Sequence, residues 1–247
     1  MKKVCFVLAL FGMLLFCYAA IGAEKTHWGY TGDIGPEHWA ELSEEFEMCA
    51  KGKNQSPINL TNFIKADLLP LEFNYQGSPT EILNNGHTIQ VNCPRGSKYI
   101  AYQKVFELWQ FHFHAPTEHL IEGKSFPIEA HFVHFDKKGN LSAIAVMLVE
   151  GPENQLLKKL WKKMPLKIGD KHKLSAELNP LGLFPEDKSY YLYNGSFTTP
   201  PCTEGGFWVI MKSPVSVSKK QINAFKQVIG HPNNRPVQPR NTRTVLL

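Results

Sequence analysis

Five extended runs of β-forming residues limit the folds open to this chain more than any other feature of its sequence. The runs are rich in Val, Ile, Phe, Trp and Thr, and short turn signals such as NNG, PRGS and DKKGN separate them. They occupy residues 87–93, 100–114, 128–136, 141–151 and 206–217. Because consecutive strands joined by short turns pair in antiparallel fashion, we predict a mainly β fold built on a mostly antiparallel sheet.

Three weaker helical patterns, at residues 36–50, 154–164 and 218–230, predict a few peripheral helices. The last pattern begins with Ser218, a favourable N-cap residue, and ends before Gly230. The chain has 247 residues, of which 43% are hydrophobic and 20% are charged, and its sequence contains no repeat, low-complexity segment or linker. This composition is that of a globular protein, and we predict a single domain.

The first residues form the pattern of a secretory signal peptide. A short basic start precedes an almost unbroken apolar run from Val4 to Phe16, and small residues then lead to a cleavage site after Ala23. An uncleaved membrane anchor over Val4 to Ala23 is the alternative. We predict a signal peptide at 1–23, a folded domain at 24–247, and a periplasmic or secreted protein with no stable membrane insertion after cleavage.

The basic residues predict no nucleic-acid partner. Loss of Lys2 and Lys3 with the signal peptide lowers the formal net charge from +5 to +3. The remaining lysines are dispersed, for example over 158–163 and 171–173, which is typical of a solvated surface.

Three cysteines remain after signal cleavage, namely Cys49, Cys93 and Cys202. An odd number of cysteines in an oxidising compartment predicts one disulfide and one leftover thiol. The spacing of the three residues does not decide which two of them pair.

The stretch QFHFHAPTEH, residues 110–119, concentrates histidines on a predicted strand. Side chains alternate between the two faces of a strand, so Gln110, His112 and His114 share one face. On the next predicted strand His131 shares a face with Glu129, and antiparallel pairing would bring His131 beside the other two histidines. Three imidazoles with one open position are typical of a catalytic zinc site, in which Gln110 and Glu129 would orient the rings.

Two other interpretations of this stretch compete with a three-histidine zinc site. Two histidines at alternate positions are often surface residues, so the zinc site depends on the third ligand. The pattern His-x-His-x3-Glu is also found in cupins, where Glu118 would be a metal ligand, but the glycine that a cupin needs is replaced by Phe106. For His119 and His134 a structural role is as plausible as a functional one.

Seven short segments are informative when they are taken together and in their order along the chain. They are HWGYTG (27–32), KNQSPINL (53–60), ILNNGHTIQV (82–91), QFHFHAPTEH (110–119), EAHFVHFD (129–136), YNGSFTTPPCTEGGFWVI (193–210) and NNRPVQPRNTR (233–243). In this order, from Trp28 to Arg243, they resemble an α-class carbonic anhydrase in its bacterial, exported form. The resemblance implies a central twisted sheet of about ten strands. It also implies reversible hydration of carbon dioxide to bicarbonate and a proton by zinc-bound hydroxide, with ester hydrolysis as a side activity.

The resemblance also assigns roles to individual residues. It makes His112, His114 and His131 the ligands of a zinc ion, with Gln110, Glu129 and a backbone carbonyl near Asn233 as orienting groups. It makes His87 a proton shuttle and Thr198 the residue that orients the hydroxide, with Glu118 as the hydrogen-bond partner of Thr198. The pocket for carbon dioxide is assigned to Val133, Ala143, Phe197, Thr199 and Trp208.

The resemblance implies a disulfide between Cys49 and Cys202. Cys93 is then left over, either as a buried thiol or as a cysteine that joins two chains in a homodimer. Some chains with this fold have lost zinc ligands and act as binding modules, but all the ligand positions are present here. The resemblance therefore implies a zinc enzyme, a carbonate dehydratase.

Overall fold

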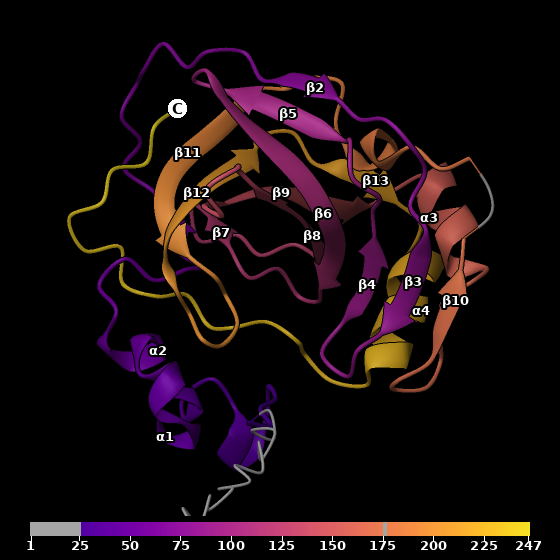
Figure 1. The fold of residues 1–247 in the computed structure, drawn as a ribbon, viewed down its shortest axis with the longest axis horizontal. Coiled ribbons are helices and arrows are strands. Elements are labelled where there is room, and N and C mark those ends of the chain that lie inside the picture. Colours follow the sequence, from indigo (N-terminus) through magenta and orange to yellow (C-terminus); the bar gives the residue numbers. More distant parts are fainter. Residues whose placement is uncertain (1–25, 175–176) are drawn as a thin grey trace, which may run out of the picture.

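The computed structural model describes residues 26–174 and 177–247, and it is mainly β (Figure 1). Its large sheet has 11 strands, with β10-β3-β4-β6-β8-β9-β12-β11 as the main path and β2, β5 and β13 paired beside it. The strands of this sheet are β2 (Glu72–Asn74), β3 (Glu81–Asn84), β4 (Ile89–Asn92), β5 (Lys98–Ala101), β6 (Lys104–His114), β8 (Ile128–Phe135), β9 (Leu141–Glu150), β10 (Lys171–Lys173), β11 (Tyr190–Ser196), β12 (Glu204–Met211) and β13 (Val215–Val217). A separate parallel pair consists of β1 (Asn59–Leu60) and β7 (Leu120–Ile121).

Most strand pairs in the large sheet are antiparallel, as the sequence predicted. The exceptions are β12 and β13, which both run parallel to β9. The predicted mainly β fold with about ten strands and a few peripheral helices is confirmed.

Both faces of the central strands are buried, because apolar side chains cover the sheet on each side. On β6 and β8, Phe111, Phe113 and Phe132 point into the larger hydrophobic cluster. Ala143 of β9 and Trp208 of β12 belong to a smaller cluster on the opposite face. The histidines predicted as ligands alternate with the phenylalanines and lie on the face of this smaller cluster, so the core and the candidate site use opposite sides of the same strands.

One predicted strand, at residues 100–114, is a hairpin in the structure. Strand β5 ends at Ala101 and β6 begins at Lys104, and the two strands pair in antiparallel fashion. The turn residues Tyr102 and Gln103 have positive φ angles of 50° and 62°. Glycine, asparagine and aspartate favour this conformation and mark turns in a sequence, so a Tyr-Gln turn gives no such signal.

The helices are short, and the two at residues 155–161 and 219–229 pack on the phenylalanine face of the sheet, where Trp161 and Phe225 contact Phe113. The helices are α1 (Trp39–Leu42), α2 (Met48–Lys51), α3 (Gln155–Trp161) and α4 (Lys219–Ile229), together with the 3-10 turns Gly32–Ile34, Glu44–Phe46 and Pro180–Leu183. Helix α4 has the predicted boundaries, with Ser218 and Gln221 forming a capping box and Gly230 as a left-handed C-cap. The predicted helix at 36–50 is broken at Ser43, which is extended and caps the following turn through the backbone N–H of Glu45.

The N-terminal segment with α1 and α2 lies at the lower left in Figure 1. It packs through its own small cluster, which includes Tyr30, Trp39 and Phe46. A disulfide between Cys49 and Cys202 joins this segment to the loop after β11, in agreement with the pairing that the resemblance implied. Closing a loop of 153 residues is expected to contribute about 2–5 kcal/mol to stability. Cys93 is a half-buried free thiol, and burial raises its pKa to about 12.

No helix in the described part of the chain is long and apolar enough to cross a membrane. The predicted signal peptide at residues 1–23 lies outside the described residues.

Candidate metal centre and active site

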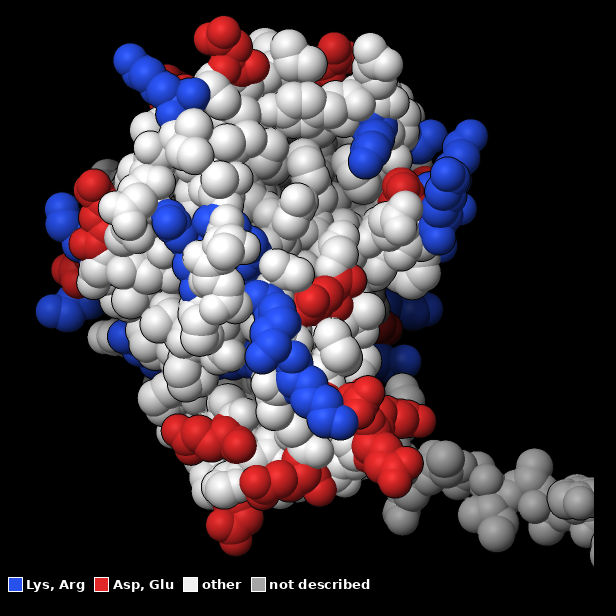
Figure 2. Space-filling model, turned by 90° about the vertical axis from the view of Figure 1, so that its left-hand side faces the viewer, with Lys and Arg blue, Asp and Glu red and all other residues white. Residues whose placement is uncertain are grey.

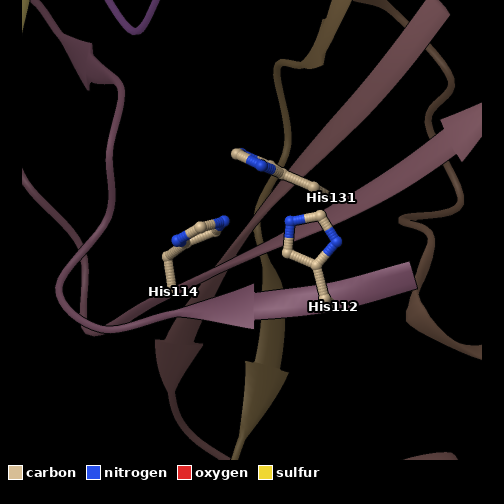
Figure 3. A group of neighbouring side chains, drawn as sticks. All are labelled: His112, His114 and His131. Atoms are coloured by element: carbon tan, nitrogen blue, oxygen red, sulfur yellow. The ribbon is translucent and has the colours of Figure 1, made fainter. Parts of the chain in front are cut away.

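Three histidines from two neighbouring strands point toward one another (Figure 3). His112 and His114 lie on β6, and the antiparallel register places His131 of β8 directly opposite His112. One ring nitrogen from each histidine lies within 4.8 Å of the others. His114 and His131 are buried, whereas His112 is half-buried. The sequence predicted this convergence, since it follows from strand alternation and from the pairing of consecutive strands.

Each of the three rings is held by a hydrogen bond from its other nitrogen. His112 Nδ1 lies 2.8 Å from Oε1 of Gln110, and His131 Nε2 lies 2.7 Å from Oε1 of Glu129. His114 Nδ1 donates to the backbone carbonyl of Asn233 at 2.7 Å. When one nitrogen of a neutral imidazole donates, the other nitrogen keeps a lone pair. The free lone pairs are therefore on Nε2 of His112, Nε2 of His114 and Nδ1 of His131.

The unpaired atoms of this group fit a metal ion. His114 Nε2 is buried and has no hydrogen-bond partner in the structure. Burial lowers the pKa of His112 and of His114, and the neighbouring imidazoles lower that of His112 further. Burial would also lower the pKa of His131, but the carboxylate of Glu129 outweighs it and the pKa is raised. Three imidazole nitrogens are a ligand set that zinc prefers.

Glu129 is the acceptor on which this arrangement depends. Its Oε1 accepts hydrogen bonds from His131 and from His119 Nδ1 at 2.7 Å and 2.6 Å. Its Oε2 accepts the backbone N–H groups of Glu118 and His119 at 2.8 Å and 2.9 Å. Burial opposes ionisation of Glu129, but His119 and His131 outweigh it and hold its pKa well below the usual range. Glu129, His119 and His131 could also hold a metal geometrically, but these hydrogen bonds already account for their close approach.

His119 has a structural role in this network. Its Nε2 lies 2.6 Å from the hydroxyl of Tyr193, which in turn contacts Oγ of Ser56 at 2.8 Å. Both ring nitrogens of His119 are therefore engaged within the protein. Residue type does not show that His119 differs in role from the three converging histidines, because the contacts that engage its ring appear only in the structure.

Glu118 lies beside two of the three histidines, His114 and His131. Its Oε1 accepts the backbone N–H of Arg235 at 2.7 Å, whereas its buried Oε2 has no hydrogen-bond partner among the residues that the structure describes. This Oε2 lies 3.5 Å from Nε2 of His114 and 3.8 Å from Nδ1 of His131. Thr198 is buried, but no hydrogen bond joins its hydroxyl to Glu118 in the part of the chain that the structure describes. The partnership of Thr198 and Glu118 stays a prediction.

His87 sits on the turn between β3 and β4. Its ring stacks on that of Trp28, with centroids 3.7 Å apart and planes 5° from parallel. Burial lowers its pKa, and His27 and His231 lower it further. The backbone carbonyl of His87 accepts a hydrogen bond from Nδ2 of Asn233 at 3.0 Å. Asn233 therefore links the turn of His87 to the ring of His114.

The residues predicted to form the apolar pocket come from adjacent strands. Val133 of β8 is opposite Ala143 of β9, and Ala143 is opposite Trp208 of β12. All three are buried, and the ring of Trp208 lies 4.9 Å from that of His131. Phe197 and Thr199 are half-buried in the segment that follows β11.

Arg235 was not found by sequence analysis, although it braces the site. Its backbone N–H binds Glu118, and its buried guanidinium donates to the side chain of Gln55 and to the carbonyls of Ser56 and Cys49, each at 2.8 Å. Desolvation lowers the pKa of Arg235 to about 10. An arginine before a proline in a segment without regular structure looks like a surface residue in the sequence, so no local pattern points to this role.

Comparison with known proteins shows which protein family this chain resembles. A family model for eukaryotic-type carbonic anhydrase matches residues 34–247. The chain is 44% identical to a carbonic anhydrase of Neisseria gonorrhoeae over 238 residues, which cover 95% of this chain and 94% of that protein. It is 42% identical to a carbonic anhydrase of Pectobacterium atrosepticum over 234 residues, 95% and 96% of the two chains. A solved α-carbonic anhydrase of Thermovibrio ammonificans, in complex with the inhibitor sulfanilamide, matches with a TM-score of 0.88 and 48% identity, covering 91% of this chain and 100% of that one.

The fold and the three converging histidines define a lyase of the carbonate dehydratase class, as these comparisons support. The chain belongs to the eukaryotic-type, or α-class, carbonic anhydrase family. The resemblance to this family, which was predicted from the seven sequence segments, is confirmed.

Proposed function

We propose that this protein binds one zinc ion through His112, His114 and His131 and catalyses the reversible hydration of carbon dioxide to bicarbonate and a proton. The observation that carries the proposal is the set of three imidazoles whose outer nitrogens are held by Gln110, Asn233 and Glu129. When bound, zinc would act as a Lewis acid that lowers the pKa of a coordinated water to about 7 and so supplies the nucleophile.

The residues around the histidines support roles in positioning and substrate binding. The unpaired Oε2 of Glu118 faces the same space as the free nitrogens, so it can fix the direction of the hydroxyl of Thr198 in the reacting enzyme. A hydroxyl that donates to Glu118 can only accept a hydrogen bond from the nucleophile, which orients the nucleophile before reaction. Carbon dioxide is apolar, and Val133, Ala143 and Trp208 offer it an apolar wall, with Phe197 and Thr199 beside them.

Zinc content and carbon dioxide hydration of the purified protein test this proposal directly. We expect one zinc ion per chain by atomic absorption and rapid hydration in a stopped-flow assay. We also propose ester hydrolysis at the same site as a side activity. A protein that folds normally and takes up no zinc, or that binds zinc without hydrating carbon dioxide, would contradict the proposal.

Replacement of His87 by alanine is expected to lower turnover by about 100-fold in dilute buffer, if His87 transfers protons to solvent. Because the pKa of His87 lies below its usual value, its ring is neutral at pH 7 and can accept a proton. This contribution is lost as the pH falls through the lowered pKa of His87. Stopped-flow turnover over a range of pH and imidazole concentrations measures the effect.

Added imidazole should restore turnover of the His87→Ala variant, because it replaces the missing proton acceptor. The exposed His38 offers a matched control, and His38→Ala should leave turnover unchanged in every buffer. Unchanged turnover of His87→Ala in dilute buffer would show that protons leave by another route.

We propose further that residues 1–23 direct export and that the folded domain begins at residue 24. The disulfide between Cys49 and Cys202 supports an oxidising compartment, periplasmic or extracellular. Mass spectrometry of the mature protein would test the cleavage site.

A further inference from the structure

The segment 158–173, from α3 to β10, carries a concentration of positive charge. Seven lysines and one aspartate lie within it, a net charge of +6, whereas the whole chain has a net charge of +5. The remaining residues of the chain therefore have a formal net charge close to zero. All seven lysines are exposed: Lys158, Lys159, Lys162, Lys163, Lys167, Lys171 and Lys173. We call this region the basic loop surface.

The fold keeps the lysine-rich stretches 158–163 and 171–173 close together. Leu156, Leu157 and Leu160 are buried on one side of α3, so the lysines of this helix are left on the solvent side. The carbonyl of Lys163 accepts a hydrogen bond from Nδ1 of His172 at 2.8 Å, which ties β10 to the segment that follows α3. Only two ion pairs with acidic residues involve these lysines among the described residues, with Glu153 and with Glu81.

Two aliphatic side chains project from the same surface. Leu166 and Ile168 are 71% and 76% exposed, the highest values among the exposed large hydrophobic residues of the described chain. The loop that carries them is anchored, because Met164 and Pro165 are buried beneath it. Its other end is fixed by backbone hydrogen bonds between Gly169 and the carbonyl of Asn84, at 2.8 Å, and between Asn84 and the carbonyl of Asp170, at 3.1 Å.

The combination of projecting aliphatic residues and a dense lysine cluster fits a lipid surface. Aliphatic side chains insert at the boundary between headgroups and acyl chains, while lysines extend to the phosphates of anionic lipids. Protein interfaces, by contrast, are depleted in lysine and are built around a buried core of aromatic residues and arginine. We propose that the basic loop surface docks on a bilayer that contains anionic phospholipid, with Leu166 and Ile168 inserted between the headgroups.

The docking would use one side of the molecule. Helix α3 and β10 lie together at the edge of the fold, on the right in Figure 1. Figure 2 views the molecule from the opposite, left-hand side, where basic and acidic side chains are interspersed. A bilayer with negative charge would therefore attract the basic loop surface more strongly than this face.

The docked surface would border the turn that carries His87. A Cβ atom at Gly86 would lie 3.2 Å from Cγ2 of Ile168, so the loop packs directly against the residue before His87. Adsorption would thus bring one rim of the candidate site close to the lipid headgroups. The lipid-binding proposal itself does not depend on the role of His87.

Co-sedimentation of the purified protein with vesicles tests the proposal. We expect binding to vesicles of equal parts phosphatidylcholine and phosphatidylglycerol, weakening with added salt, and little binding to phosphatidylcholine alone. The variant Leu166→Ser/Ile168→Ser should bind at least about tenfold more weakly, because it loses the inserted side chains. The variant Lys162→Gln/Lys163→Gln/Lys167→Gln should lose about 100-fold, at roughly fivefold for each lysine.

A matched variant tests whether binding depends on this surface or only on the total positive charge of the protein. The variant Lys53→Gln/Lys65→Gln/Lys137→Gln removes the same charge from exposed sites elsewhere and should bind nearly as wild type. Carbon dioxide hydration in solution should be unchanged in all these variants, which shows that they fold. The proposal is overturned by an absence of preference for phosphatidylglycerol, by an equal loss in the control, or by unchanged binding of Leu166→Ser/Ile168→Ser. Binding to poly-glutamate without binding to vesicles would point to an acidic protein partner and would also overturn it.

Discussion

Replacement of His112 by alanine is expected to abolish zinc retention and carbon dioxide hydration together. The variant leaves only Nε2 of His114 and Nδ1 of His131 as imidazole ligands, so the loss of zinc affinity should exceed the 10–100-fold that removal of an orienting partner typically costs. Without the metal, the pKa of water returns from about 7 to its far higher value in bulk solvent, and the nucleophile is essentially absent at neutral pH. Hydration should fall to the uncatalysed background.

His112 is the best of the three histidines for this experiment. It is half-buried, and within the described ranges its side chain hydrogen-bonds only to Gln110, so its removal disturbs the core less than removal of His114 or His131. Circular dichroism should therefore show a normal fold, and His38→Ala should retain zinc and activity. Incubation of the wild type with a chelator should reproduce the defect, and added zinc should reverse it. An active, zinc-containing His112→Ala variant would refute the ligand assignment.

Glu118→Gln is expected to lower turnover, whereas Glu129→Gln is expected to lower zinc affinity. Both variants replace a buried carboxylate by a nearly isosteric amide. Glutamine at position 118 can still accept the N–H of Arg235, but it loses the negative charge of Oε2. We expect zinc to be retained and turnover to fall by about 10²–10³-fold, the loss that follows removal of one preorganised hydrogen-bonding group. Stopped-flow hydration at saturating zinc measures this effect.

Glutamine at position 129 disrupts the acceptor that holds His131. Four donors converge on this carboxylate, and an amide group can accept through only one of its two terminal atoms. We expect a 10–100-fold loss of zinc affinity by chelator competition, together with a lower free energy of unfolding. The reverse pattern, with zinc lost in Glu118→Gln and retained in Glu129→Gln, would make Glu118 a metal ligand, as in the cupin pattern.

The histidine cluster was predictable because it depends on local rules. Strand alternation places His112 and His114 on one face, and pairing of consecutive strands brings His131 opposite. The orienting contacts of Gln110 and Glu129 follow from the same alternation, since each lies two residues from the histidine that it holds. The boundaries of α4 were predictable for a similar reason, because its caps are encoded by adjacent residues.

The contacts that cross long stretches of chain could not be read from local pattern. Arg235 binds Gln55 and Cys49 across 180 and 186 residues, and no spacing rule joins positions so far apart. The disulfide and the carbonyl near Asn233 were reached only through resemblance to a family. The turn at Tyr102 and Gln103 was missed because its residues lack the side chains that usually mark a positive φ.

The position of Asn233 and Arg235, far downstream of the strands that carry the three histidines, has a consequence for biosynthesis. A chain is made from its N-terminus, and early segments begin to fold before later ones exist. The strands with the three histidines therefore emerge long before the residues that orient His114 and bind Glu118. The contacts that orient His114 and hold Glu118 cannot form until this later segment has been made, so metal loading should follow its synthesis. Premature termination before Asn233 would yield a chain with every histidine ligand and an incomplete metal centre.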